Sequence, residues 1–388
     1  MSGADALGDA RRGVAVLGST GSIGTATLRV LARHADRFAL RALTAHRNAA
    51  LLAEQAAEFA PAYVGVTDEG SAATAEASGW HTGSRVLLEA ATRPDVDVVV
   101  NAVVGAAGLD ATLAALRAGR RVALANKETL VMAGPLVRAA ARAGCGELVP
   151  VDSEHSAILQ CIAGRPRQAV RRLIITASGG PFRTWDAARL AGATIADALQ
   201  HPTWSMGRKI TVDSATLANK ALEVIEAHEL FGVPYDRIEV VVHPQSVVHS
   251  MVEFVDGSVL AQLGAPSMEV PILYALTHPE RVPDTALRPF DPVAYGRLDF
   301  EPVRRDAFPM LDLGIAAGRT GRAAPAVYNA ANEAAVAGFL DGRLAFGDIP
   351  VAVERALDAL GTAPGDTIDA LRAADAAARQ LVRDSLAP

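Results

Sequence analysis

A buried strand, a glycine turn and a helix follow one another near the start of the chain, and this order constrains the fold most. Residues 13–17 predict a β-strand buried on both faces, and Gly18-Ser-Thr-Gly-Ser-Ile-Gly24 leads into a helical run over residues 25–35. Glycines let backbone N–H groups approach an anion, and a helix N-terminus favours a phosphate. The spacing is G-x-x-G-x-x-G, a variant of the dinucleotide-binding fingerprint. Glycine turns also join strands to helices for packing reasons alone.

The alternation of strands and helices continues to about residue 151, after a loosely held tail that we expect to end near Ala10. Further strands are expected over residues 38–43, 63–66, 96–104, 121–125 and 147–151. Helices are expected over residues 48–60, 69–78, 109–118 and 130–143. This pattern predicts a parallel sheet covered by helices, and it stops near Pro150, which indicates a domain boundary.

Length and composition limit the class of protein. A chain of 388 residues exceeds what one core usually holds, so we expect two or three domains. A net charge of -6 argues against a nucleic-acid or anionic-membrane partner. Two cysteines, Cys145 and Cys161, provide neither a disulfide framework nor a zinc cluster, and we see no signal peptide or membrane-spanning run. We therefore expect a cytoplasmic enzyme.

The second expected strand ends where dinucleotide-binding folds contact the ribose. NAD-specific folds place an acid there for the 2′-hydroxyl, whereas this chain has His46-Arg47-Asn48. Arg47, with His46 beside it, favours a 2′-phosphate and hence NADP(H). The alternative is an exposed arginine that binds no ligand.

Polar residues also follow two later strands, at the sheet edge where ligands bind in α/β folds. Asn126-Lys127-Glu128 is either a helix cap or a set of contacts to a substrate oxygen. Asp152-Ser153-Glu154 places two carboxylates one residue apart, and a divalent cation would relieve their repulsion. The alternative is a solvated loop in which one acid caps the next helix.

The middle of the chain offers a second group of polar residues. A strand over residues 172–176 precedes Ser178-Gly-Gly-Pro, which suits either an anion or a plain tight turn. Residues 200–209 have the composition of a lid, although Trp204 is equally compatible with a core position. A helix is expected over residues 214–231, with Ser214, Asn219 and Lys220 as phosphate donors and Glu223 as a third carboxylate.

The last part of the chain is less informative. We expect a strand over residues 238–242 and a hairpin around Asp256-Gly257, both in an antiparallel part of a second sheet. His249 is interpreted as an ordinary strand histidine. Residues 277–309 indicate a linker, and three or four alanine-rich helices follow to Leu386.

Several motifs together resemble the 1-deoxy-D-xylulose 5-phosphate reductoisomerase family. They occur in the family's order over nearly the whole chain: Gly18-Ser-Thr-Gly-Ser-Ile-Gly24, Ala125-Asn-Lys-Glu128, Val151-Asp-Ser-Glu-His155, Ala177-Ser-Gly-Gly-Pro-Phe182, Trp204-Ser-Met-Gly-Arg-Lys-Ile210, the segment 214–223, and His243-Pro-Gln-Ser246. The resemblance implies NADPH-dependent conversion of 1-deoxy-D-xylulose 5-phosphate to 2-C-methyl-D-erythritol 4-phosphate in the non-mevalonate isoprenoid pathway. One departure is His46, where family members commonly have glycine.

The resemblance also implies the roles of individual residues. The ligands of Mg²⁺ or Mn²⁺ would be Asp152, Glu154 and Glu223, and these with Lys127 would be the catalytic residues. Substrate contacts would come from Lys127, Ser153, Glu154, Ser178, His201, Trp204, Met206, Ser214, Asn219, Lys220 and Glu223. NADPH contacts would come from Thr20, Gly21, Ser22, Ile23, His46, Arg47, Asn48, Asn126, Glu128 and Gly207. The family is typically homodimeric.

The expected architecture is α/β. It has a Rossmann-like NADPH-binding domain (residues 1–150), an α+β catalytic domain (151–283), a linker (284–311) and a C-terminal helical bundle (312–388). A different NADP-linked dehydrogenase would explain the glycine turn and Arg47, but not three carboxylates beside a phosphate site. A silent paralogue that only binds NADPH or a sugar phosphate would be expected to lack a metal ligand, and none is missing.

Overall fold

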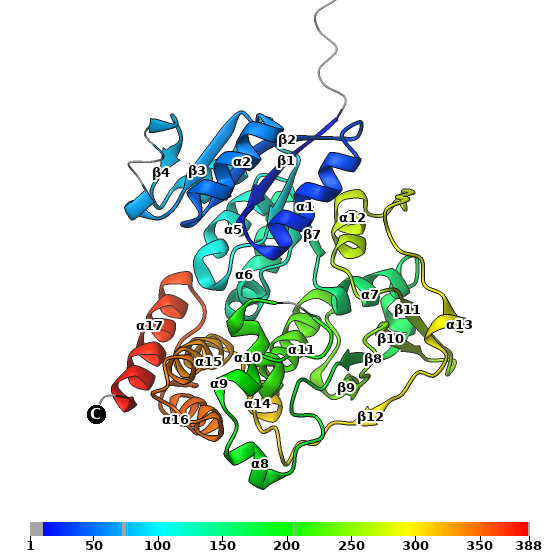
Figure 1. Cartoon of the computed structure of the whole chain (residues 1–388), viewed down its shortest axis with the longest axis vertical. Helices are drawn as coiled ribbons and strands as arrows, with labels where there is room; N and C mark the ends of the chain where they lie inside the picture. The colour runs from blue at the N-terminus through cyan, green and yellow to red at the C-terminus, as the bar shows by residue number, and fades with distance from the viewer. Residues whose placement is uncertain (1–10, 72–74, 76, 205, 387–388) are drawn as a thin grey trace, which may run out of the picture. The chain divides into compact units, whose positions relative to one another are not determined.

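The computed structural model describes residues 11–71, 75, 77–204 and 206–386, which form two compact units (Figure 1). The first unit comprises Met1–Thr129, Val137–Asp152 and Met268–Leu287, and the second comprises Leu130–Leu136, Ser153–Ser267 and Arg288–Pro388. The expected tail to Ala10 and part of the helix expected over residues 69–78 lie outside the described residues.

The first unit is built on a parallel sheet with the strand order β4-β3-β2-β1-β5-β6-β7. The strands are β1 (Arg12–Leu17), β2 (Phe38–Ala45), β3 (Tyr63–Val66), β4 (His81–Thr82), β5 (Val98–Asn101), β6 (Arg121–Leu124) and β7 (Glu147–Pro150). The helices are α1 (Ser22–Arg33), α2 (Ala49–Phe59), α4 (Val86–Thr92), α5 (Leu109–Arg117), α6 (Lys127–Gly144) and α12 (Glu269–Thr277). This confirms the Rossmann-like architecture.

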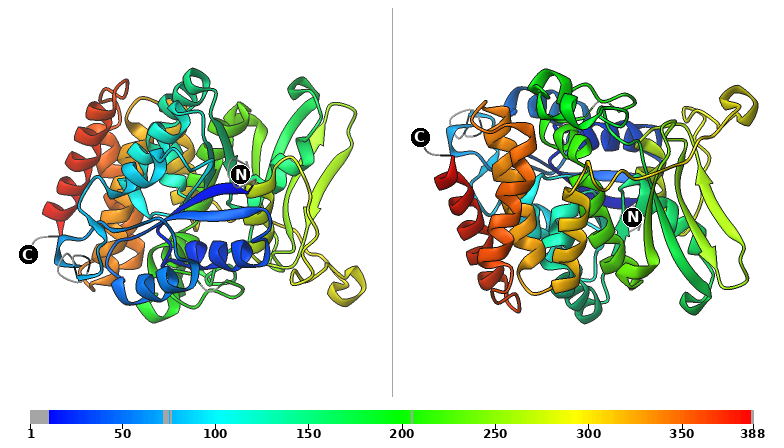
Figure 2. Two further views of the ribbon diagram at one scale, coloured as in Figure 1. Left: turned by 90° about the horizontal axis from the view of Figure 1, so that it is seen from above. Right: turned by 90° about the horizontal axis from the view of Figure 1, so that it is seen from below.

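The strand order reverses beside β1, and this places the glycine turn at a switch point of the sheet. Right-handed crossovers put α1 and α2 on one face of the sheet and α4 and α5 on the other (Figure 2). Val14, Val16 and Leu17 of β1 have no exposed surface, which explains why this strand is apolar at every position rather than at alternate ones.

The second unit contains a mixed sheet with the order β11-β10-β8-β9-β12. Its strands are β8 (Val170–Ala177), β9 (Ile238–Val242), β10 (Val248–Phe254), β11 (Val259–Leu263) and β12 (Glu301–Pro302). The β10–β11 hairpin is confirmed and is antiparallel. The antiparallel interpretation is wrong for β9 against β8, because these two strands pair in parallel. The segment expected to be a linker adds β12 to the edge of the sheet beside β9.

Helices make up most of the rest of the second unit. They are α7 (Ser153–Ile162), α8 (Ala187–Ala191), α9 (Ile195–Ala198), α10 (Arg208–Thr216), α11 (Ala218–Phe231), α13 (Pro292–Tyr295), α14 (Met310–Thr320), α15 (Ala324–Leu340), α16 (Ile349–Leu360) and α17 (Ile368–Ser385). Helix α7 packs on β10 and β11, and α11 packs on β9, α14 and α15. The four C-terminal helices α14–α17 confirm the expected helical bundle (Figure 1).

The single helix expected over residues 214–231 is wrong. Two helices, α10 and α11, meet at Leu217, whose backbone is left-handed with φ 63. Leucine rarely adopts this conformation, and neither glycine nor proline marks the break, so propensity gives no signal for it. Ser214 therefore belongs to a different helix from Asn219, Lys220 and Glu223. Among the residues that the structure describes, no helix is long and apolar enough to cross a membrane.

Candidate active site

The glycine turn is a backbone cradle at the N-terminus of α1. A Cβ atom on Gly24 would lie 2.3 Å from the carbonyl oxygen of Gly18 and 2.5 Å from Cα of Ser19, so only glycine fits there. Gly21 occupies the N-cap position and has no side chain to accept the first N–H groups of the helix. Thr20, Gly21, Ser22 and Ile23 therefore line a backbone site suited to a pyrophosphate.

The turn is fastened by a residue that sequence reasoning missed. The Ser19 hydroxyl donates to Gln55 Oε1 at 2.7 Å, and Gln55 Nε2 donates back to the Ser19 carbonyl at 3.1 Å. Gln55 is 5% exposed although it is polar. A polar residue on the buried face of α2 was the available signal, because a buried amide requires partners.

Three polar side chains lie at the carboxyl end of β2. His46, Arg47 and Asn48 are all exposed, and Asn48 caps α2 by accepting the N–H of Leu51. Arg47 Nε lies 3.4 Å from Asp68 Oδ1, and Arg47 is 76% exposed. His46 Nδ1 is 2.9 Å from the Thr67 hydroxyl. Arg47 is thus paired with one partly buried carboxylate and is accessible to a phosphate.

The segment after β6 has the helix cap that was one of the two roles considered for it. Asn126 caps α6, since its Oδ1 accepts the N–H of Thr129 at 3.1 Å, and its Nδ2 donates to the carbonyls of Val103 and Gly105. The helix cap is therefore present. The neighbouring Lys127 Nζ pairs with Asp152 Oδ2 at 2.7 Å, and both Lys127 and Glu128 are buried.

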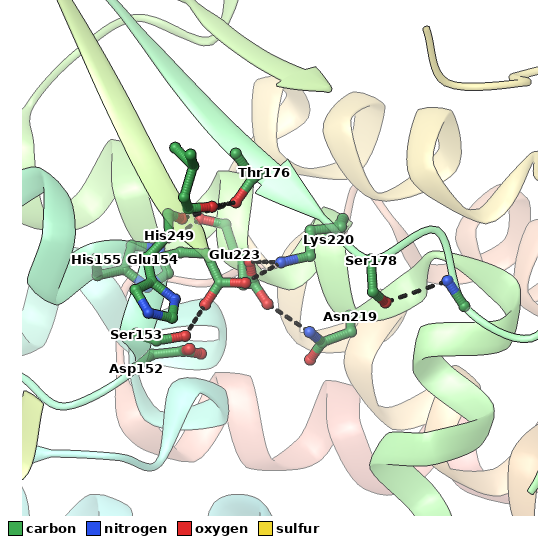
Figure 3. A network of polar contacts seen from close by, with 12 residues as sticks. Asp152, Ser153, Glu154, His155, Thr176, Ser178, Asn219, Lys220, Glu223 and His249 are labelled. Atoms are coloured by element: carbon green, nitrogen blue, oxygen red, sulfur yellow. Dashed lines mark hydrogen bonds and ion pairs between the residues drawn. The ribbon is translucent and has the colours of Figure 1, made fainter. Parts of the chain in front are cut away.

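Three carboxylates converge after β7 and on α11. Ligand oxygens of Asp152, Glu154 and Glu223 lie within 4.8 Å of one another (Figure 3). An all-oxygen set of this kind fits a hard cation such as Mg²⁺ or Mn²⁺. Glu154 is partly exposed, which leaves the group accessible to a substrate. The structure thus brings together the three residues expected to bind a metal.

A second possible ligand group shares Asp152 but adds the fully enclosed His155 and Glu226. His155 Nε2 donates to the backbone carbonyl of Glu223 at 2.9 Å, and its Nδ1 lies 3.4 Å from Glu226. His155 thus supports the helix that carries Glu223. We favour the all-carboxylate group as the metal site, because His155 and Glu226 are wholly shielded from any substrate.

A buried lysine balances the acidic charge. Lys220 Nζ donates to Glu223 Oε2 at 2.6 Å and also to Glu154, while Asn219 Nδ2 donates to Glu223 (Figure 3). Burial by itself would lower the pKa of Lys220, but the charges of Glu154 and Glu223 raise it above its usual value. Lys220 is therefore a cation, and the structure places it at the carboxylates.

Ser178 follows β8 and is oriented by His201. Nδ1 of His201 accepts the N–H groups of Thr203 at 3.1 Å and Trp204 at 2.9 Å, so the proton must sit on Nε2, which lies 3.0 Å from Ser178 Oγ. The Ser178 oxygen also accepts the N–H of Gly180 at 3.2 Å. With both lone pairs accepting, its hydroxyl proton is left to donate, which suits a phosphate oxygen. Burial, and then Lys220, lowers the pKa of His201 to about 4.

The glycine pair after Ser178 brings a second serine close. Gly180 has φ +67, and a Cβ there would lie 2.6 Å from the carbonyl oxygen of Ser214 in α10. The turn over Gly179 and Gly180 is therefore a tight, built turn that contacts α10. Trp204 and Met206 are half-buried in the loop before α10, so Trp204 is not a fully buried core residue.

The structure places His249, which we interpreted as an ordinary strand histidine, on β10 near the carboxylates. It is 7% exposed on β10 and is drawn beside Glu154 in Figure 3. Burial lowers its pKa, and the charge of Glu154 acts in the opposite direction.

Comparison with known proteins identifies the family. Models of the 1-deoxy-D-xylulose 5-phosphate reductoisomerase domains match residues 14–134, 148–231 and 263–381. Curated reductoisomerases are 51% identical over 392 residues in Xanthomonas oryzae, with 98% of each chain covered, and 50% identical over 378 residues in Gloeobacter violaceus, with 95% and 96% covered. The chain belongs to the 1-deoxy-D-xylulose 5-phosphate reductoisomerase family.

Solved structures of reductoisomerases have the same fold. The Zymomonas mobilis enzyme in complex with NADPH is 44% identical with a TM-score of 0.91, covering 97% of this chain and 99% of that one. A reductoisomerase bound to NADPH, fosmidomycin and magnesium is 38% identical with a TM-score of 0.91, covering 97% and 98%. The predicted family membership is thereby confirmed.

Proposed function

We propose that this chain converts 1-deoxy-D-xylulose 5-phosphate to 2-C-methyl-D-erythritol 4-phosphate, using NADPH and a divalent cation. The reductoisomerase relatives, and solved structures that contain NADPH and magnesium, support this function. The observation that carries it is the convergence of Asp152, Glu154 and Glu223 beside Lys220 and Asn219. Other NADP-linked dehydrogenases of hydroxy acids do not need this combination.

We assign the metal to the three carboxylates. Asp152, Glu154 and Glu223 would hold Mg²⁺ or Mn²⁺ and leave coordination positions for substrate oxygens. Lys127, already paired with Asp152, and Ser153, which donates to Glu154, would orient the substrate's hydroxyl groups. These side chains are buried or nearly so, and their charges therefore act with little screening.

The substrate phosphate would bind to donors from three elements. Ser178, with its hydroxyl proton oriented outward by His201, and Ser214, Asn219 and Lys220 provide these donors. Anchoring the phosphate fixes the orientation of the reacting carbons and lowers the entropic part of the barrier. Trp204 and Met206 would contact the substrate and exclude water.

The cofactor would bind to the first unit. The pyrophosphate would contact Thr20, Gly21, Ser22 and Ile23, and the 2′-phosphate would contact His46, Arg47 and Asn48. Asn126, Glu128 and Gly207 would complete the cofactor contacts. NADPH supplies the reducing equivalent when bound, and the cation supplies the positive charge that polarises the substrate's carbonyl group.

We propose that each of the expected domains has its own role. Residues 1–150 would form the NADPH-binding domain, residues 151–283 the catalytic domain, residues 284–311 a linker and residues 312–388 the C-terminal helical domain. The enzyme would act as a cytoplasmic homodimer on a small sugar phosphate. A chain whose two cysteines are both free is consistent with a reducing compartment.

The test is an assay of NADPH oxidation with 1-deoxy-D-xylulose 5-phosphate and Mg²⁺ or Mn²⁺. Turnover should require the sugar phosphate and should disappear with EDTA, while NADPH binding measured by fluorescence should persist. Absence of turnover with metal present would refute the function. Turnover that resists EDTA would refute only the metal assignment.

A further inference from the structure

Helix α10 carries Ser214 but has few local restraints on its position. It is short, it follows a loop without regular structure, and it ends at the left-handed residue Leu217. Its apolar residues Val212 and Ala215 are fully buried, but hydrophobic burial is non-directional and does not by itself fix the rotation of a helix. A directional interaction, such as a hydrogen bond or an ion pair, is needed to fix Ser214 against the Gly179-Gly180 turn.

Asp213, the residue before Ser214, provides that direction. Its side chain is 1% exposed, Lys209 Nζ lies 2.9 Å from its Oδ2, and Asn332 Nδ2 donates to its Oδ1 at 2.8 Å. A buried carboxylate is costly unless it is paired and hydrogen-bonded. Its Oδ1 accepts a hydrogen bond from α15, and its Oδ2 is in an ion pair with a residue of α10 itself.

The side chain of Asn332 has one hydrogen bond among the described residues, the one to Asp213. It has no exposed surface, and its amide oxygen has no hydrogen-bond partner among the described residues. Burying an unpaired amide oxygen costs free energy. The hydrogen bond from Nδ2 to Asp213 offsets this cost, which explains why asparagine is suitable at this position. The neighbouring Tyr328 is buried too, and burial together with the charge of Asp213 raises its pKa well above the usual value.

The α15 helix is itself fixed by ion pairs. Glu333, next to Asn332, binds Arg379 of α17 at 2.7 Å, and Arg379 also binds Asp375 at 2.7 Å. Glu333 lies 3.9 Å from Lys209, the partner of Asp213. A continuous polar connection thus runs from α17 through α15 to the residue beside Ser214.

We infer that Asn332 is a positioning residue for substrate binding: through its hydrogen bond to Asp213, the C-terminal helices hold α10 at the position where Ser214 can bind the substrate phosphate. This inference rests on the proposed phosphate-binding role of Ser214. Asn332 itself touches neither substrate nor cofactor, and the chemical step should be insensitive to it.

The experiment compares steady-state kinetics and thermal unfolding of five variants. Asn332→Leu removes the donor at nearly constant volume, and KM for the sugar phosphate should rise about 10-fold with kcat within about twofold. NADPH affinity should not change. Asn329→Leu is the matched control, because Asn329 lies one turn earlier on α15, is 1% exposed and donates to Glu333 instead of Asp213. It should lower stability while leaving KM near the wild-type value.

Two further variants separate positioning from general damage. Asn332→Asp places two carboxylates face to face and should raise KM more than Asn332→Leu does. Adding Asp213→Asn to Asn332→Asp restores the hydrogen bond with its direction reversed, so that residue 213 donates and residue 332 accepts. This double variant should recover much of the lost affinity for the sugar phosphate. An unchanged KM in Asn332→Leu, an equal rise in Asn329→Leu, or no recovery in the double variant would each overturn the inference.

A Ser214→Ala variant distinguishes failure of the inference from failure of the proposed function. A raised KM in Ser214→Ala with a normal KM in Asn332→Leu would refute the positioning role alone. A normal KM in Ser214→Ala would remove Ser214 from the phosphate site, and the inference about Asn332 would fail with it.

Discussion

The glycine turn and the acidic site of this chain are built in opposite ways. The glycine turn uses consecutive residues, Gly18 to Gly24, and presents backbone N–H groups at the start of one helix. The acidic site uses side chains from separate elements, and its Glu154–Lys220 contact joins residues 66 positions apart. A site made of backbone is fixed by local conformation, whereas a site made of side chains depends on tertiary packing.

The largest effect is expected from removing a side chain of the second region. Glu223→Gln keeps the volume but removes one of three carboxylates, and it leaves Lys220 with one fewer counter-charge. Losing even an outer-shell partner of a metal typically costs about 10–100-fold, so turnover should fall by more than about 100-fold. Calorimetry should show weaker Mg²⁺ or Mn²⁺ binding, with unchanged NADPH affinity.

Glu239→Gln is the control for this change, since Glu239 is an exposed residue of β9 paired with Arg172. It should keep wild-type turnover. If Glu223→Gln retained activity within a few-fold, Glu223 would not be a ligand, and the second region would not depend on converging carboxylates.

The reverse experiment targets the backbone region. Gly24→Ala introduces a Cβ that meets backbone atoms of Gly18 and Ser19, so the turn must move. Overpacking of this kind costs about 1–3 kcal/mol, and the Kd for NADPH should rise about 10-fold or more, with metal binding intact. Gly21→Ala should have a smaller effect, because its Cβ would lie 3.4 Å from the carbonyl oxygen of Gly18, which is an ordinary van der Waals contact. Equal effects of the two substitutions would contradict a sterically defined cradle.

This contrast also explains what the sequence could predict. The first sheet and its glycine turn follow from apolar runs and local residue preferences, which are readable without knowing any contact. The break at Leu217 is not readable, because a buried leucine adopts φ 63 only under tertiary constraint. The same holds for β12, a two-residue strand that exists only because β9 provides a partner.

The residues of the candidate site differ in the same way: some could be predicted from local sequence, and others depend on partners far away in the chain. Carboxylates that follow a strand are a local signal, so Asp152 and Glu154 could be proposed from their spacing. Glu223 could be proposed as a third carboxylate on its helix, but only the resemblance to a family made it a metal ligand with Asp152 and Glu154, because nothing local relates it to residues so far away in the chain. Gln55 could have been found from its place on the buried face of α2, but the partners of Gln55 and Asn332 could not be predicted, because they lie on other elements.

A smaller effect is expected from pH, and only in the side-chain region. The turn from Gly18 to Gly24 has no titratable side chain, whereas His201 must be unprotonated at Nδ1 to accept the N–H groups of Thr203 and Trp204. Its pKa is lowered from 6.5 to about 4 by burial and by Lys220. Between these two values the unfolded chain binds a proton that the folded chain does not, so stability falls as pH decreases from about 6.5 to about 4.

His201→Gln cannot titrate and should lose less stability over that range. The difference in melting temperature between pH 6.5 and pH 4 should be about 2 °C smaller in the variant, which thermal unfolding at several pH values can measure. Parallel pH profiles for the two proteins would show that His201 is not held neutral by the fold.

The smallest effect is expected at the exposed side chains of the cofactor region. Asp68 pairs with Arg47 across 3.4 Å, so a 2′-phosphate approaching Arg47 meets a competing carboxylate. Exposed ion pairs are worth about 0.2–1 kcal/mol, and Asp68→Asn should therefore tighten NADPH binding by roughly twofold to fivefold without changing NADH binding. In an Arg47→Ala background, the same substitution should have no effect. Weaker NADPH binding in Asp68→Asn would mean that Asp68 helps to bind the cofactor. The side chains around Arg47 would then bind their ligand through a tertiary arrangement, as the acidic site does, and not through local backbone conformation as the glycine turn does.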